Sequence, residues 1–223
     1  MSLFTFALVA TRPPDEILLI NNASTDETAE VARAIPGICV IDEPVKGLVV
    51  ARERARREAF GDVLVYVDAD CRAPIFWLER IERRLESRPA SVAITGPYKF
   101  YDWDFMGRAL IRSYDCLVAP PTHLLVHYGF GLGAVLYGGN FAVRREALAR
   151  IGGFDRTVEF HGEDTNLGRR LTPIGTVELA NDCWVWTSAR RYPRDGQAEG
   201  LWSLYSKLLV GDPAASSRRL RSP

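Results

Sequence analysis

The chain has 223 residues, of which 47% are hydrophobic and 25% are charged, as in an ordinary globular protein with one large domain or two small lobes. Lys plus Arg number 28 and Asp plus Glu number 28, so the sequence lacks the basic excess of a general nucleic-acid binder. The four cysteines are far apart and form no CxxC pair, which suggests neither a zinc site nor a disulfide framework and fits a reduced cytosolic setting.

No stretch of the sequence is expected to span a membrane. The longest nearly apolar run, residues 124–137, is too short to cross a bilayer. The first ten residues are apolar but lack the basic region of a signal peptide. We therefore expect a cytoplasmic protein without a transmembrane segment. For the apolar residues at 124–126, core packing is favoured over peripheral contact with the inner face of the membrane.

The first half of the chain alternates strands and helices. Residues 3–10 have the composition of a strand, and a turn follows at 11–14. Apolar, β-branched runs predict strands at 16–20, 38–41, 63–67 and 91–95. Helical spacing predicts helices over 24–35, from 46 to about 59 and from 74 to about 85, with Ser24 and Glu27 forming a capping box at the first of them. This order predicts an α/β fold with a mostly parallel sheet flanked by helices.

The second half, after Gly96, is less regular. Residues 98–137 are rich in aromatic side chains, with one helix expected over 104–118. A glycine-rich turn at 138–140 leads into a strand at 141–143, and a short helix over 145–151 ends at two glycines. Further helices are expected from 163 to Pro173 and over 199–210, with strands at 176–179 and 184–187. We expect a single domain over residues 1–212 and a flexible tail over 213–223.

Two aspartates, Asp68 and Asp70, follow the buried strand at 63–67. In open α/β folds, ligands bind at the edge formed by the carboxyl ends of the strands. Two acids this close repel each other unless a cation lies nearby, and a divalent metal ion with oxygen ligands would be such a partner. The alternative is that both acids cap the helix that begins near Pro74. The residues alone leave both readings open.

Five short motifs occur in a fixed order within this predicted fold. They are 21–26 (Asn-Asn-Ala-Ser-Thr-Asp), Lys46-Gly47 with Arg52, Asp68-Ala69-Asp70, Gly138-Gly139-Asn140 and Glu163-Asp164. Each motif is weak alone, but the five in order, over residues 15–192, resemble the family 2 glycosyltransferases. The resemblance implies a GT-A fold, with a nucleotide-sugar-binding half over 1–95 and an acceptor-binding, catalytic half over 96–212.

The resemblance also implies a reaction. An inverting transferase would move a sugar from a nucleoside-diphosphate sugar, expected to be UDP-linked, to a hydroxyl of a carbohydrate or lipid-linked acceptor. Asp70 would hold Mg²⁺ or Mn²⁺ on the diphosphate, and Asp68 would contact the ribose or a metal-bound water. Such an ion neutralises the charge that the departing diphosphate gains. Glu163 and Asp164 match the pair that supplies the catalytic base, and we expect Asp164 to be the base, with Glu163 second.

The other motif residues are expected to bind the donor. By resemblance, the nucleotide-sugar-binding positions are Asn21, Asp26, Lys46, Arg52, Asp68, Gly139, Asn140, Arg190 and Arg191. Glycine lets backbone approach a sugar closely, and arginine forks suit phosphate oxygens. Each motif has a structural alternative: a helix cap at 24–27, a solvated helix face at 46–52, a hairpin turn at 138–140, an acidic first helical turn at 163–164 and a solvated loop at 190–191. His161 is not expected to take part in catalysis.

The N-terminus departs from the family pattern, because only fifteen residues precede the strand at 16–20. The short N-terminus favours, as an alternative, a non-catalytic or truncated relative that binds nucleotide sugars. A second alternative is an aspartate-nucleophile phosphatase of the haloacid dehalogenase type, since a strand ending in Asp-x-Asp also suits that class. However, Cys71 and Arg72 follow Asp70, where that class has Thr or Val, and the motif lies far from the chain start.

Overall fold

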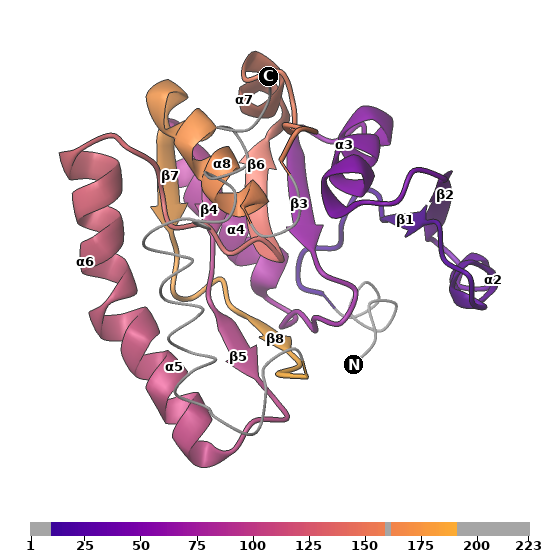
Figure 1. Cartoon of the computed structure of the whole chain (residues 1–223), viewed down its shortest axis with the longest axis horizontal. Helices are drawn as coiled ribbons and strands as arrows, with labels where there is room; N and C mark the ends of the chain where they lie inside the picture. Colours follow the sequence, from indigo (N-terminus) through magenta and orange to yellow (C-terminus); the bar gives the residue numbers. More distant parts are fainter. Residues whose placement is uncertain (1–9, 159–161, 191–223) are drawn as a thin grey trace, which may run out of the picture.

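The computed structural model describes residues 10–158 and 162–190. The expected strand at 3–10 lies almost entirely outside these residues. His161, Arg191, the expected helix over 199–210 and the expected tail over 213–223 also lie outside them. Within the described residues, the predicted alternation of strands and helices is confirmed. Figure 1 shows a central sheet with helices on both of its faces.

The central sheet has four strands in the order β3–β6–β4–β7 (Figure 1). They are β3 (Val63–Val67), β6 (Asn140–Arg144), β4 (Ser91–Thr95) and β7 (Thr176–Leu179). β4 and β7 are parallel, whereas β6 is antiparallel to both of its neighbours, so three of the four strands share one direction. The mostly parallel sheet expected from the sequence is therefore confirmed. Because β6 begins where β3 ends, the glycine-rich turn before β6 lies against the Asp68 end of β3.

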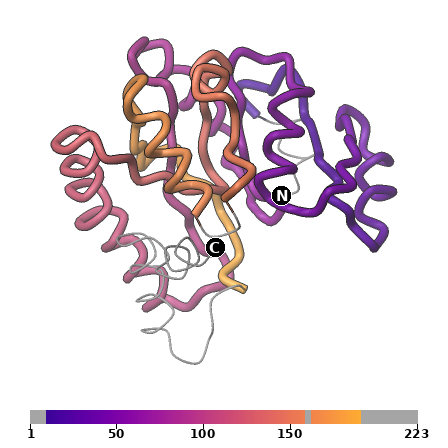
Figure 2. The backbone as a smooth tube through the Cα atoms, turned by 45° about the horizontal axis from the view of Figure 1, so that its top comes forward, coloured from indigo at the N-terminus to yellow at the C-terminus, as the bar shows by residue number. Residues whose placement is uncertain are grey.

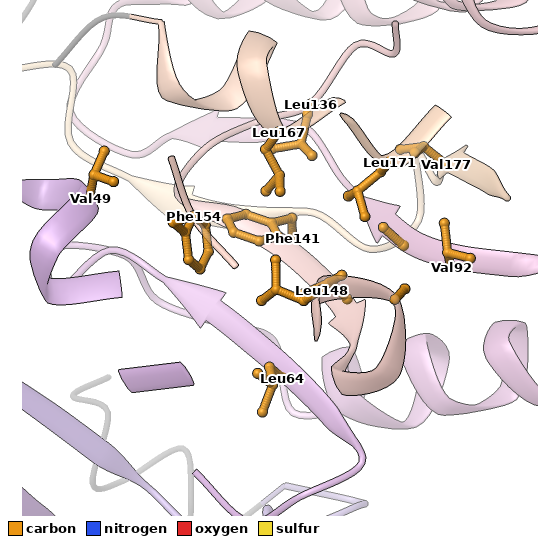
Figure 3. Close-up of a cluster of buried hydrophobic side chains, with 13 residues drawn as sticks. Val49, Leu64, Val92, Leu136, Phe141, Leu148, Phe154, Leu167, Leu171 and Val177 are labelled. Carbon is orange, nitrogen blue, oxygen red and sulfur yellow. The ribbon is translucent and has the colours of Figure 1, made fainter. Parts of the chain in front are cut away.

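Alternate residues of β6 belong to two separate hydrophobic cores, since successive side chains of a strand point to opposite faces. Phe141 lies in the first core, where Figure 3 shows it beside Phe154 and Leu167. Ala142 lies in the second core, together with Trp77. The helices around the sheet are α3 (Leu48–Glu58), α4 (Trp77–Ser87), α7 (Arg145–Arg150) and α8 (Glu163–Leu171). The sheet is thus anchored from both faces, which fixes the rim where its strands end.

A second, two-stranded parallel sheet consists of β1 (Leu18–Asn22) and β2 (Cys39–Glu43), connected by α2 (Thr28–Arg33). It lies on the β3 side of the molecule, close to α3 (Figure 1). The prediction of a capping box at the start of α2 is wrong. The helix begins later than predicted, so Glu27 becomes the N-cap residue and makes no side-chain cap hydrogen bond. Instead, the Thr28 amide donates to Asp26 Oδ1 at 3.1 Å.

The aromatic segment after Gly96 is more regular than expected. It forms β5 (Tyr98–Phe100), which pairs in parallel with β8 (Val185–Thr187), and then a helical arm. The arm consists of α5 (Phe105–Leu117), α6 (Ala119–His123) and the π-helix η1 (Leu124–Gly129). Figure 2 shows this arm on the opposite side of the central sheet from β1 and β2. In the described part of the chain, every helix falls short of the length and apolar character that crossing a bilayer requires.

Two buried histidines hold the arm on the central sheet. His123 Nε2 lies 2.8 Å from the Val177 carbonyl oxygen, and His123 Nδ1 accepts from the Val135 amide at 3.2 Å. His127 Nε2 accepts from the Val177 amide at 3.0 Å, and its Nδ1 lies 3.1 Å from Thr172 Oγ1. A ring nitrogen that accepts from an amide carries no proton, so both imidazoles are neutral here. Consistently, burial lowers the pKa of His123 to about 4 and also lowers the pKa of His127.

Candidate active site

The end of β3 and the glycine-rich turn before β6 are in direct contact. The Asp68 amide donates to the Gly139 carbonyl at 3.3 Å, and the Gly139 amide donates to Tyr98 Oη at 2.5 Å. A Cβ atom at position 139 would clash with Asp68 Oδ2 and lie 2.7 Å from Tyr98 Oη. Only glycine therefore fits at position 139, where backbone, an aspartate and a tyrosine meet. The sequence analysis identified Gly139 but did not predict the part played by Tyr98.

Arg52 of α3 joins the two acidic motifs. Its side chain is only 8% exposed, and Nη2 donates to the Gly138 carbonyl at 2.5 Å. Nη2 also lies 3.9 Å from Asp68 Oδ1, while Nη1 lies 3.5 Å from Glu163 Oε1. One buried guanidinium therefore carries positive charge to both carboxylates. We call Arg52, Asp68, Gly138, Glu163 and Asp164 the Arg52 cluster.

Glu163 and Asp164 begin α8 on the other side of Arg52. Glu163 Oε2 accepts from the Gly162 amide at 3.0 Å, and Asp164 Oδ1 accepts from the Thr165 amide at 2.7 Å. A Cβ atom at Gly138 would lie 3.5 Å from Asp164 Cβ and 3.6 Å from its Oδ2, so Asp164 faces the glycine-rich turn. Burial, and then the negative charge of Glu163, raise the pKa of Asp164. A raised pKa makes this carboxylate a better proton acceptor than an ordinary surface aspartate.

Asp70, the second aspartate of the motif, contacts a different arginine. Arg190 Nη2 lies 2.9 Å from Asp70 Oδ2, and the Asp70 side chain is only 15% exposed. The segment after β8 holds Arg190 in place. The Arg190 amide donates to Ser188 Oγ at 3.2 Å, and the neighbouring Ala189 amide donates to Asp102 Oδ1 at 2.6 Å. Arg190 is therefore positioned at the carboxylate for which the sequence predicted a metal ion.

Asn140 has a supporting role that differs from the one expected. Its side chain is buried, and Nδ2 donates to the carbonyls of Gly96 at 2.8 Å and Cys183 at 2.9 Å. Its Oδ1 accepts from Trp77 Nε1 at 3.2 Å. Asn140 points into the same core as Ala142, because residues two apart on a strand share a face. The expected sugar contact thus does not fit the orientation of this side chain, which holds β6 against its neighbours.

Asn21, Asp26 and Lys46 lie in the β1–β2 unit, and their described contacts are local. Asn21 Nδ2 donates to Asp42 Oδ1 at 2.8 Å, and Asp26 accepts from the start of α2. Lys46 is exposed in the turn before α3. The sequence analysis missed Asn22, whose Oδ1 accepts from the Gly47 amide at 2.7 Å and so ties that turn to β1. Within the described residues, none of these three side chains forms a hydrogen bond or ion pair with the Arg52 cluster.

The sequence profile of one family, described as Glycosyl transferase family 2, matches residues 3–152. The chain belongs to this family. Among curated relatives, Glycosyltransferase AglE of Haloferax volcanii is 25% identical to this chain over 173 residues, which cover 75% of the chain and 54% of AglE. Probable N-acetylgalactosaminyltransferase 8 of Caenorhabditis elegans is 23% identical over 156 residues, which cover 63% of the chain and 34% of that protein.

The fold agrees with a solved structure of such an enzyme. Mannosyltransferase PcManGT from Pyrobaculum calidifontis, in complex with GDP-Man and Mn²⁺, superposes with a TM-score of 0.63 and 21% identity. The match covers 97% of this chain and 59% of PcManGT. The GT-A fold expected from the sequence is thus confirmed. The chain spans between 34% and 59% of the length of these three relatives.

The chemistry of Asp68 and Asp70 decides whether this part of the chain could hold a metal ion. Within residues 10–158 and 162–190, no group of three or more His, Cys, Asp or Glu side chains forms a complete metal cage. Mg²⁺ is commonly held by one or two carboxylates, with substrate phosphates and water as the other ligands. Asp70 already holds a cationic group, the Arg190 guanidinium. Asp68 and Asp70 therefore fit Mg²⁺ or Mn²⁺ as partial ligands.

Proposed function

We propose that the chain transfers a glycosyl group from a nucleoside-diphosphate sugar to an acceptor hydroxyl, with inversion at the anomeric carbon. The observation that carries this proposal is the position of Arg52, whose guanidinium lies 3.9 Å from Asp68 and 3.5 Å from Glu163. It brings together the two acidic motifs that such a transfer needs, one for the leaving diphosphate and one for the attacking hydroxyl.

Asp70, Asp68 and Arg190 form the donor side of the proposed site. Asp70 and Asp68 would hold Mg²⁺ or Mn²⁺, and the ion would supply positive charge to the diphosphate as its bond to the sugar breaks. PcManGT, which has a similar fold, binds GDP-Man and Mn²⁺. This similarity supports a sugar nucleotide and a divalent ion as ligands of the chain described here. In the donor complex, the Arg190 guanidinium would donate to phosphate oxygens, for which its planar fork is well suited.

Asp164 is the proposed base, with Glu163 as the second candidate. Asp164 accepts the proton of the acceptor hydroxyl while the hydroxyl oxygen forms its bond to the anomeric carbon from the side opposite the diphosphate. The bond between the anomeric carbon and the diphosphate oxygen breaks, and the nucleoside diphosphate leaves with the electron pair. Glu163 is engaged by Arg52 and by the Gly162 amide, which favours a positioning role for it.

Ligand-dependent stabilisation tests the donor side directly. We expect UDP or GDP with Mn²⁺ to raise the melting temperature of the purified chain, since a ligand at about 100 times its Kd stabilises the native state by about 2.7 kcal/mol. Asp70→Asn should abolish this shift. Asp62→Asn is the matched control, because Asp62 is exposed just before β3 and makes no ion pair among the described residues. If no nucleoside diphosphate stabilises the wild-type chain in the presence of metal, the proposal is wrong.

Product analysis separates the enzyme from a binding protein. If UDP or GDP with Mn²⁺ raises the melting temperature of the wild-type chain, we also expect that chain to transfer the sugar to an acceptor. When acceptor is absent, we expect slow hydrolysis of the sugar nucleotide. Stabilisation without either reaction would instead favour the non-catalytic relative that binds nucleotide sugars. The family assignment leaves the aspartate-nucleophile phosphatase without support, and release of phosphate from a generic phosphomonoester would be needed to revive it.

A further inference from the structure

A pocket of about 420 Å³ opens beside the β5–β8 pair. Its walls include two arginines and two aromatic residues, which are Arg72, Arg108, Tyr101 and Trp186. Arg72 belongs to the segment between β3 and α4, two residues after Asp70, and Arg108 belongs to α5. Three segments that are far apart in the sequence, at 72–75, 101–108 and 186, thus build one cavity next to the proposed donor site.

Backbone hydrogen bonds connect the segments that form the walls of this pocket. The Arg72 amide donates to the Trp186 carbonyl at 2.7 Å, and the Trp186 amide donates back to the Arg72 carbonyl at 2.9 Å. The Tyr101 amide donates to the Thr187 carbonyl at 3.2 Å. Arg72 therefore forms an antiparallel bridge with Trp186 of β8, and Tyr101 continues the β5 side of the β5–β8 pair. The guanidinium carbon of Arg72 lies 4.6 Å from the centre of the Tyr101 ring, so the ring holds the arginine in place.

Two cationic side chains line this pocket without an ion-pair partner among the described residues. Arg72 and Arg108 are exposed, and neither forms an ion pair with a carboxylate in residues 10–158 or 162–190. The carboxylates closest to Arg108 in the sequence are those of Asp102, which accepts from the Ala189 amide, and Asp104, which accepts from the Gly107 amide. The neighbouring Lys99 lies 3.4 Å above the Trp184 ring. Burial, and then the charges of Arg112 and Arg80, lower the pKa of Lys99.

We propose that this pocket binds a phosphate group of a ligand other than the donor nucleotide. Arg72 and Arg108 would donate to the phosphate oxygens, because guanidinium groups match phosphate in shape and charge. Trp186 offers a ring face on which an attached sugar can stack. The ligand class is therefore a sugar phosphate, either free or as the headgroup of a lipid. The argument rests on the pocket alone and does not depend on the proposed transfer reaction.

The first experiment measures binding with a soluble probe. Trp186 lines the pocket, so titration with glucose 1-phosphate should change the tryptophan fluorescence of the full chain, with saturation below about 10 mM. Unphosphorylated glucose should leave it unchanged. We expect Arg108→Gln and Arg72→Gln each to weaken binding by about tenfold or more. The matched control is Arg150→Gln, because Arg150 is also exposed on a helix and lies outside the pocket.

A second measurement assigns the source of the phosphate. Sedimentation with phosphatidylcholine vesicles, with and without phosphatidylinositol, whose headgroup is a phosphate that carries a sugar-like ring, tests a lipid headgroup. Binding to the anionic vesicles that Arg108→Gln removes would assign the phosphate to a lipid, whereas binding to glucose 1-phosphate alone would assign it to a soluble ligand. Either result supports the proposal.

Three outcomes would overturn the proposal. The first is no saturable binding to either probe, and the second is equal binding by wild type and both arginine variants. The third is a parallel loss of UDP or GDP binding in Arg108→Gln, which would make the pocket part of the donor site. Because Arg108 is exposed, the variant should keep the wild-type melting temperature, and that measurement excludes misfolding as the cause of lost binding.

Discussion

Arg52 Nη1 lies 3.5 Å from Glu163 Oε1, although α3 and α8 carry these residues at opposite ends of the domain sequence. The same guanidinium lies 3.9 Å from Asp68 Oδ1. Removing Arg52 would take this positive charge away from both carboxylates, and burial penalises charge that loses its compensation. Arg52 is therefore expected to matter both for the stability of the domain and for its activity.

Arg52→Gln should lower transfer by about 100-fold or more, since it removes preorganised positive charge from the reacting region. It should also lower the free energy of unfolding by about 3 kcal/mol, as expected when one partner of a buried ion pair is removed. Arg54→Gln is the matched control on the same helix, because the exposed Arg54–Glu58 pair contributes at most about 0.5 kcal/mol. Urea unfolding and initial rates measure the two effects. Equal losses of unfolding free energy and of transfer rate in Arg52→Gln and Arg54→Gln would contradict the role assigned to Arg52.

Asp164→Asn should abolish most of the transfer, by about 100-fold or more in kcat, while nucleotide binding stays intact. Glu163→Gln should lower kcat less if Glu163 acts mainly through Arg52. The wild-type rate should fall at acidic pH, with a midpoint above that of an ordinary aspartate, because the pKa of Asp164 is raised. Full activity of Asp164→Asn would show that the base lies elsewhere.

The same pKa shift predicts how Asp164 affects stability. A carboxyl whose pKa is raised in the folded state favours folding while protonated, and that contribution is lost as pH rises through the folded pKa. Asp164→Asn should therefore gain stability relative to wild type at pH 8, and the gain should shrink at acidic pH. Urea unfolding at the two pH values measures this difference.

Arg190→Gln should change metal and nucleotide binding in opposite directions. Removing the guanidinium that lies 2.9 Å from Asp70 frees this carboxylate, so Mn²⁺ alone should bind more tightly, by about threefold or more. The nucleoside diphosphate with metal should bind about tenfold more weakly, because one charged donor to phosphate is lost. Electron paramagnetic resonance of free Mn²⁺ and calorimetry measure the two effects. A variant that loses affinity for both ligands would instead indicate general damage to the site.

The stability of the helical arm should depend on pH through His123. Its pKa is about 4 in the folded chain against about 6.5 when unfolded, so folding favours the neutral imidazole. This contribution, up to about 3 kcal/mol, is present above pH 6.5 and is lost as pH falls towards 4. Asp115, on the same arm, acts in the opposite sense, because burial raises its pKa to about 6 and its contribution is lost as pH rises.

His123→Gln should therefore flatten the fall in unfolding free energy between pH 7.5 and pH 5, relative to wild type. At pH 7.5 the variant should be less stable, since the hydrogen bonds to Val177 and Val135 are lost. Urea unfolding at three pH values, with Asp115→Asn as a companion variant, gives the comparison. An unchanged slope in His123→Gln would assign the pH dependence to other groups.

Sequence patterns that act locally predicted much of the fold and part of the site. The apolar run before Asp68 and Asp70 predicted β3 within its observed bounds, and the acidic start of α8 placed Glu163 and Asp164 correctly at a helix N-terminus. The alternation of strands and helices was enough for the mostly parallel sheet. These features depend on residues that are neighbours in the chain.

The unpredicted features depend on partners that are distant in the sequence. The motif order identified Arg52, but its contacts with Asp68 and Glu163 follow from how α3 packs. Asn140 and Phe141 point to opposite faces because successive side chains of β6 alternate, so Asn140 faces Trp77 and Phe141 lies on the Arg52 side. Nothing in the tripeptide Gly138-Gly139-Asn140 reveals which neighbour each residue will face.

The insertion of β6 between β3 and β4 also bears on how the domain is assembled during synthesis. β3 and β4 are made early, yet they share no hydrogen bonds with each other, and each needs a strand that the ribosome adds later. A nascent chain that ends before residue 140 therefore lacks β6, the strand that connects β3 to β4. Asp68, at the end of β3, then also lacks its contact with the glycine-rich turn. Sheets that depend on such long-range pairing form slowly, so the unfinished chain exposes unpaired strand edges during translation.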